Sequence, residues 1–277
     1  MLARDASVPA RSKGELFSVS TNYETPQVWV FFAVCLVLFL IATEVGFRIG
    51  LWQSKRSDVP ETSHTGILTG AILGLVSFLL AFTFGFAANN YSERRNTVLE
   101  EANAIGTAYL RADLLPDVEA SEMRRLLRQY TEIRVAVTEP GVTIDGFFIA
   151  IRQSEAIHLE LWSLVAGIAK ADPSPTNSLI VSSVNDLIDL HSKRVAVGVR
   201  HAIPFTIWIS LYLVSTLALA ATGYRIGANV GKRSELLPAM VIAFACVVSL
   251  ISDLDNPRHG FLLSDQSPMR ALLGSMS

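Results

Sequence analysis

Four apolar stretches constrain this chain more than any other feature of its sequence. A helix needs roughly 20 consecutive, mostly apolar residues to cross about 30 Å of hydrocarbon. The stretches that reach or approach this length are 28–51, 66–88, 203–224 and 236–251. With 51% hydrophobic and only 17% charged residues, the chain is too apolar for an ordinary soluble domain. The sequence therefore predicts an all-α membrane protein with four transmembrane helices.

Polar sequence separates the four spans into two pairs. Residues 89–202, between the second and third spans, are long enough to form a domain. Residues 1–27 form a polar N-terminal segment, and residues 252–277 form a C-terminal tail. Because the N-terminal segment lacks the apolar run of a cleavable signal peptide, we expect the first span to be retained.

The segment 89–202 has the pattern of a helical domain. Good helix formers continue from the second span to Arg111 without a breaker, which predicts one long helix that leaves the bilayer and ends before Pro116. Apolar residues then recur at three- and four-residue spacings, the signature of helices with one buried face. Three further helices are expected, over 117–138, 144–169 and 178–200.

The distribution of basic residues bears on orientation. Of the 23 Lys and Arg residues, 17 lie on the side of the termini and the domain. The other six lie in or beside the two short loops: Arg48, Lys55, Arg56, Arg225, Lys232 and Arg233. By total count, the positive-inside rule predicts that both termini and the domain are cytoplasmic. By density, the short loops favour the reverse orientation.

The first and third spans end in similar sequences. The first ends in GFRIG (46–50) and the third in GYRIG (223–227), 177 positions later. A duplicated pair of spans would produce this similarity. Convergence would also produce it, because Tyr and Arg recur at membrane boundaries of unrelated proteins.

The second span carries two sets of residues at four-residue intervals. They are a glycine set, Gly66, Gly70 and Gly74, and a phenylalanine set, Phe78, Phe82 and Phe86. Each step of four residues turns about 40° around a helix, so the centres of the two sets differ by about 120°. Small residues let helices approach closely in lipid, so we expect the glycine set to pack on another helix. The phenylalanine set faces lipid, a neighbouring helix or a pore.

Charged residues near the spans have simple structural interpretations. Glu44 and Arg48 have the i,i+4 spacing of a local salt bridge. Asp253 and Asp255 follow the last span, where a capping turn before a proline is expected. The basic residues Arg124, Arg125, Arg128 and Arg134 are most simply a solvated helix face.

The residues around the phenylalanine set carry a family resemblance. The string LAFTFGFAANNY (80–91) resembles the pore helix of bacterial bestrophins, in which an apolar neck precedes asparagines. The turn DLDNPRHG (253–260) resembles their acidic turn after the last span. The segment EANAIGTAYLRADLLP (101–116) is the most recognisable part of a similarity, from about residue 28 onward, to uncharacterised bestrophin-like membrane proteins.

This resemblance implies a bestrophin-like fold and an oligomeric ion channel of a bacterial inner membrane. A homo-pentamer that passes small monovalent anions, chloride or bicarbonate, is expected by analogy. The implied roles are a pore neck of Phe78, Phe82 and Phe86, a pore mouth of Asn89 and Asn90, and a weak calcium site at Asp253 and Asp255. The asparagines are equally explained as helix-end polar residues at the lipid headgroups. The alternative function is a non-conducting scaffold or signalling protein whose helical domain binds a partner.

Other function classes find little support in the sequence. A formal net charge of −2 does not favour nucleic-acid binding. The histidines show no close metal-ligand spacing, and there is no phosphate-binding glycine loop or nucleophile elbow. We therefore expect no enzyme activity and no cofactor besides the weak calcium site. The expected partners are lipid, small inorganic ions and further copies of the chain.

Overall fold

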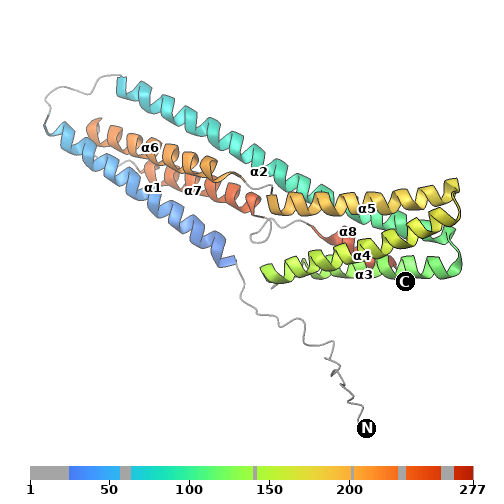
Figure 1. Ribbon diagram of the computed structural model, residues 1–277. Helices are drawn as coiled ribbons and strands as arrows, with labels where there is room; N and C mark the ends of the chain where they lie inside the picture. Colours follow the sequence, from blue (N-terminus) through green and yellow to red (C-terminus); the bar gives the residue numbers. More distant parts are fainter. Residues whose placement is uncertain are drawn as a thin grey trace, which may run out of the picture.

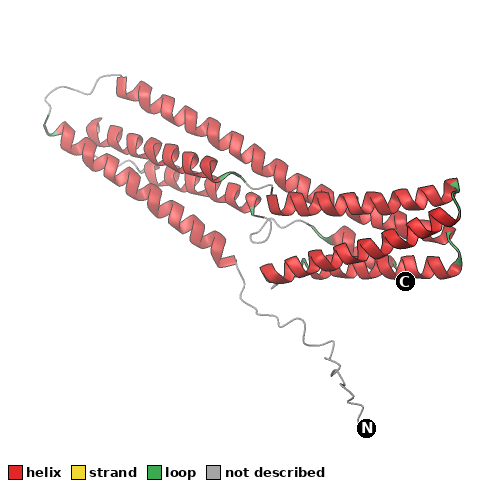
Figure 2. Ribbon diagram, viewed as in Figure 1, coloured by secondary structure: helices red, strands yellow, loops and turns green. Residues whose placement is uncertain are grey.

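The computed structural model describes residues 25–56, 64–139, 142–200, 203–229, 235–256 and 265–276. All regular structure within these ranges is helical (Figure 2), which confirms the all-α prediction. Residues 1–24 and the basic loop residues Lys232 and Arg233 lie outside the described residues, so the expectations for them stay predictions.

Four of the helices are long and apolar enough to cross a membrane. They are α1 (Thr25–Ser54), α2 (His64–Arg111), α6 (Phe205–Asn229) and α7 (Leu236–Asp255). Each overlaps one of the apolar stretches of the sequence. In Figure 1 they lie side by side as one bundle, which we call the membrane bundle.

The remaining elements form a second bundle at one end of the first (Figure 1). They are η1 (Ala112–Leu114), α3 (Asp117–Ala136), α4 (Ile144–Ala171), α5 (Pro175–Arg200) and α8 (Ser267–Ser275). Together with the second half of α2 they are called the helical domain below.

Helix α2 belongs to both bundles. Its 48 residues correspond to about 72 Å at 1.5 Å per residue, more than twice the roughly 30 Å of a bilayer core. The helix ends in the short η1 turn, in which the Leu115 N–H donates to the Ala112 carbonyl, and Pro116 then separates it from α3. The expected long helix is therefore present, and it is longer than one membrane crossing requires.

Helices α1 and α6 pack so closely that only glycine fits at their contact positions. A Cβ atom added to Gly46 would lie 2.0 Å from the Ala220 carbonyl oxygen, and one on Gly223 would lie 2.2 Å from that of Thr43. Gly50 and Gly227 make the equivalent contacts with the carbonyls of Tyr224 and Phe47. The contacts are reciprocal, because each glycine meets the residue three positions before its counterpart. Close packing thus explains why small residues recur in GFRIG and GYRIG.

The glycine set of α2 makes no comparable contact with the other described residues. The nearest atoms to a Cβ on Gly66 belong to the Arg225 side chain, at 3.5 Å. Around Gly70 and Gly74, no atom of the described residues lies within 4 Å of an added Cβ. This face of α2 is therefore open to lipid or to another copy of the chain, and its expected packing stays a prediction for the assembled protein.

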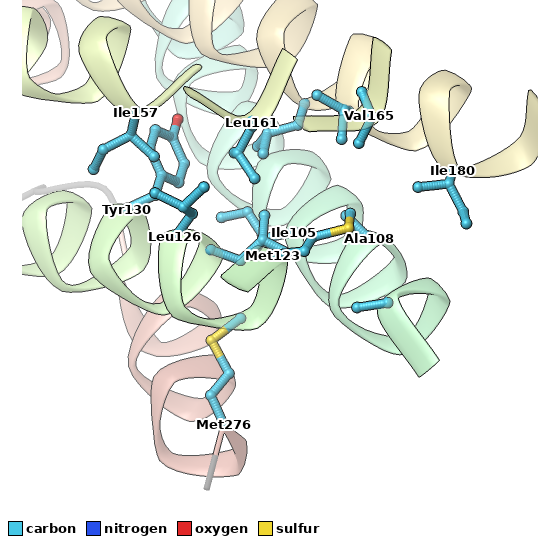
Figure 3. Packing of buried hydrophobic residues seen from close by; sticks show 14 of the residues in the cluster. Ile105, Ala108, Met123, Leu126, Tyr130, Ile157, Leu161, Val165, Ile180 and Met276 are labelled. Atoms are coloured by element: carbon cyan, nitrogen blue, oxygen red, sulfur yellow. The ribbon is translucent and has the colours of Figure 1, made fainter. Parts of the chain in front are cut away.

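A separate hydrophobic core holds the helical domain together. Ile105 of α2, Met123 and Leu126 of α3 and Leu161 of α4 converge in it and are almost completely buried (Figure 3). Met276, which follows α8, inserts into the same core. The C-terminal helix thus folds back onto its own domain, where its Leu272 side chain approaches Gly106 of α2.

The expectation of a solvated basic face on α3 is wrong for one residue. Arg125 and Arg128 are exposed and pair with acids on the same helix, as expected. Arg134 is buried and points inward to an acid on α2. A basic run on an amphipathic helix can thus extend onto the buried face when another helix supplies a counter-charge.

Candidate functional site

The phenylalanine face of α2, formed by Phe78, Phe82 and Phe86, points away from the other described helices. These side chains are 66%, 61% and 41% exposed, and the rings of Phe78 and Phe82 stack with centroids 6.5 Å apart. Three large aromatic side chains are thus aligned along one helix and are not covered by any other helix that the structure describes.

The opposite side of α2 explains this direction. Val76, Leu80, Thr83 and Ala87 are buried there, where α2 packs on α6 and α7. These buried residues are three or four positions apart and alternate with the phenylalanines along the sequence. They therefore form a separate side of the helix, which packing holds in place. The packed side therefore holds the phenylalanine face outward.

The two asparagines expected at a pore mouth do not share one environment. Asn89 is exposed on the same side as the phenylalanines, whereas Asn90 is buried and interacts within the chain. Successive residues differ by about 100° around a helix, so both cannot face one surface. Of these two asparagines, only Asn89 continues the exposed face of α2.

Asp253 and Asp255 lie in the last turn of α7, rather than in a turn after the span as expected, and an arginine joins this end of α7 to α2. Arg94 is buried and donates a hydrogen bond to the Leu254 carbonyl at the end of α7. Asp255 lies close enough to act on the Arg94 charge, and its Oδ1 accepts a hydrogen bond from the Ile203 N–H at 2.9 Å. Asp253 is buried and interacts within the chain. Asp255 thus links the end of α7 to the residues just before α6.

A buried carboxylate ties α2 into the helical domain. Glu101 is 0% exposed and accepts hydrogen bonds from the Tyr130 hydroxyl of α3 and the Arg194 guanidinium of α5. The Arg134 Nε atom of α3 lies 3.2 Å from the Glu101 Oε1 atom. Arg194 also donates a 3.0 Å hydrogen bond to Gln266, just before α8. One acid therefore connects three helices and the C-terminal segment.

Two histidines complete this Glu101 network. The His191 Nδ1 atom lies 3.0 Å from the Tyr130 hydroxyl oxygen, and the His158 and His191 rings are 4.7 Å apart. Because an ionised Glu101 can only accept, Tyr130 donates to it, and the phenol oxygen accepts from His191. Among the described residues, the Nε2 atoms of both histidines have no hydrogen-bond partner.

Burial and charge set the protonation states in this network. Burial alone would raise the pKa of Glu101, but Arg134, Arg194 and the Tyr130 hydrogen bond outweigh it and lower the pKa to about 2. Burial, together with Arg134, lowers the pKa of His158 to about 4 and that of His191 to about 3. Glu101 is therefore charged and both imidazoles neutral at neutral pH.

The Glu101 network acts as an anchor between helices. In the described ranges, no group of three or more His, Cys, Asp or Glu side chains could hold a metal ion. Glu101 was not among the site residues predicted from the sequence. The sequence feature that could have identified Glu101 is its position on the same helix face as the apolar Val98, Ala102 and Ile105. A charge buried on such a face requires a partner, because an uncompensated buried charge is costly.

The fold and most of the sequence match one family. The sequence profile of the bestrophin-like domain matches residues 30–263. The chain belongs to the bestrophin-like family. A comparison with curated protein sequences gives no match.

Solved structures with the same fold come from a bacterial bestrophin homologue of Klebsiella pneumoniae. One has a TM-score of 0.60 at 15% identity, and the match covers 90% of this chain and 95% of that chain. Two single-residue variants give TM-scores of 0.62 and 0.61, also at 15% identity, over 90% and 92% of this chain and 96% of theirs. At these identities the likeness establishes the bestrophin fold for this bestrophin-like protein.

Proposed function

We propose that this bestrophin-like protein assembles into a homo-oligomeric ion channel whose pore is lined by α2. The observation that carries the proposal is the outward phenylalanine face, on a long helix whose other side is packed against α6 and α7. Family membership is consistent with an ion channel. A single chain presents one such face, so a pore requires a ring of chains, and a pentamer is the ring that the resemblance favours.

In such a ring, Phe78, Phe82 and Phe86 form a hydrophobic neck. An apolar constriction opposes the passage of hydrated ions and gates by losing and regaining its water. The edges of aromatic rings carry a weak positive potential, which favours an anion over a cation. We therefore propose small monovalent anions, chloride or bicarbonate, as the first ions to test.

The proposed location is a bacterial inner membrane, with the helical domain and both termini in the cytoplasm. Hydropathy and length support four membrane crossings, and an even number of crossings puts both termini on one side. The total count of basic residues favours the cytoplasm for that side.

Reconstituted protein in a planar bilayer tests the proposal. The wild-type protein should pass a current, and alanine at Phe78, Phe82 and Phe86 should raise it, because the neck becomes wider and wetter. Ile41→Ala on α1 is the matched control, since Ile41 is also an exposed apolar residue of a membrane helix. Absence of current in every form contradicts the proposal.

The alternative function is a non-conducting scaffold or signalling protein whose helical domain binds a partner. The two functions differ in stoichiometry, because a scaffold needs no ring. Native mass spectrometry of the detergent-solubilised protein should give a ring-sized homo-oligomer if α2 lines a pore. A monomer or dimer would favour the scaffold.

The weak calcium site that the resemblance implies at Asp253 and Asp255 would compete with the positive charge of Arg94. The Arg94 guanidinium supplies positive charge beside Asp255, and the carboxylate already accepts the Ile203 N–H. We therefore expect the same current in the presence of Ca²⁺ and of a chelator. A current that depends on Ca²⁺ would establish the cation site instead.

A further inference from the structure

The outward face of α2 continues beyond the neck into the helical domain. Each residue advances about 100° around an α-helix, so a step of seven residues changes the direction by only about 20°. Three asparagines follow Phe82 at such steps and therefore lie about 20°, 40° and 60° from it, all displaced in the same direction around the helix: Asn89, Asn96 and Asn103. All three asparagines are exposed. If the phenylalanine face lines the pore, these amides line its extramembrane half, so this inference rests on the proposed function.

A carboxylate lies on the same line. Glu100 is 18 residues after Phe82, five complete turns of the helix, so the two residues share one direction. Its side chain is 46% exposed. Glu93 lies about 20° to the other side of Phe82, but it is half-buried and interacts within the chain. Glu100 is therefore the most directly placed acid on this face.

Lys193 of α5 neutralises this acid. Its Nζ atom lies 2.8 Å from the Glu100 Oε2 atom, and its side chain is as exposed as that of Glu100. Exposure leaves both charges within reach of an ion in the same space. A different basic residue, Arg194, serves the neighbouring buried acid Glu101. The two adjacent acids of α2 thus have separate partners, one buried and one exposed.

We propose that the Glu100–Lys193 pair sets the ion-charge preference of the extramembrane half of the pore. Rings of carboxylates favour cations, and rings of basic side chains favour anions. Lys193 cancels the acid that a ring of chains would otherwise present five complete helical turns beyond Phe82. The amides of Asn89, Asn96 and Asn103 add hydrogen-bond donors and acceptors but no net charge. The balance between the Glu100 and Lys193 charges therefore decides whether this half of the pore favours anions or cations.

Reversal potentials in a KCl gradient test this proposal on the full-length protein. Lys193→Met exposes the Glu100 charge and should shift the reversal potential towards the K⁺ equilibrium potential. Glu100→Gln leaves Lys193 alone and should shift it towards the Cl⁻ equilibrium potential. The double variant should return close to wild type. Both shifts should grow when the salt is lowered, because the screening length rises from about 10 Å at 0.1 M to about 30 Å at 0.01 M.

Lys170→Met is the matched control, because Lys170 is an exposed lysine at the end of α4. It should leave the reversal potential unchanged. Opposite shifts in the two single variants support the proposal. Currents that are present in all variants but show the same reversal potential overturn it and leave the channel intact. Absence of current in the wild-type protein overturns the proposed function itself.

Discussion

At the scale of single residues, Glu101 is the group on which the helical domain depends most. It is a buried charge held by two arginines and a tyrosine from two other helices. Removing one member of a buried charge network is costly because the remaining charges stay buried without compensation. The free-energy cost of burying these charges therefore becomes measurable when one member of the network is replaced.

Glu101→Gln should destabilise the protein by about 3–5 kcal/mol, the range for breaking a buried ion pair. The change keeps the size of the side chain but leaves Arg134 and Arg194 without their counter-charge. Thermal unfolding in detergent measures the effect. Glu132→Gln is the control, because Glu132 forms an exposed pair with Arg128 and exposed pairs contribute little. Equal unfolding temperatures for the two variants would contradict the structural role of Glu101.

Acid should destabilise the helical domain from about pH 6.5 downward. The pKa values of His158 and His191 fall from 6.5 to about 4 and about 3 on folding, so the unfolded chain binds protons that the folded chain excludes. Each imidazole costs up to about 1.4 kcal/mol per pH unit in this window. Glu101, whose pKa falls from 4.5 to about 2, adds a further loss below pH 4.5.

His158→Phe tests the source of this pH dependence. A phenyl ring preserves the contact with the Tyr130 ring, 4.9 Å away, and removes one of the two titrating groups. The loss of stability between pH 6.5 and 4 should fall by about half. An unchanged pH profile of unfolding would place the titration elsewhere.

At the scale of helices, glycines decide how closely two membrane helices pack. Gly46→Ala should lower the yield of folded protein and its unfolding temperature, because the added methyl group would overlap the Ala220 carbonyl oxygen of α6. Helices α1 and α6 must then separate. Gly167→Ala on α4 is the control, since an added Cβ meets nothing within 4 Å and alanine is the better helix former. It should leave stability unchanged or raise it.

The open glycines of α2 give the opposite expectation. Gly70→Leu should leave the single chain folded, because no neighbouring atom of the described residues lies within 4 Å of a Cβ added there. If the glycine set packs on a neighbouring copy, the substitution should reduce the oligomer to smaller species. Native mass spectrometry and unfolding temperature together measure both effects. An unchanged oligomer would assign this face to lipid.

At the scale of the whole molecule, hydropathy and helix periodicity predicted the elements well. The four apolar helices, the continuous α2 and helices α3, α4 and α5 follow from local sequence. Helix α8 was not predicted, because it lies in the segment that we expected to be a C-terminal tail. Contacts between segments that are distant in the sequence could not be predicted in this way. Arg134 and Glu101 pair across 33 positions, and His158 and His191 meet from different helices. The close α1–α6 contact was visible only as two similar pentapeptides, because a repeat does not reveal which segments touch.

Electron cryo-microscopy of the intact protein in lipid nanodiscs tests the central claim most directly. The expected result is a ring of chains, five by resemblance, in which α2 surrounds the symmetry axis and Phe82 points towards it. The Glu100–Lys193 pair should then line the wider space beyond the neck. A single chain, or an oligomer in which Phe82 faces lipid at the periphery, would contradict the pore.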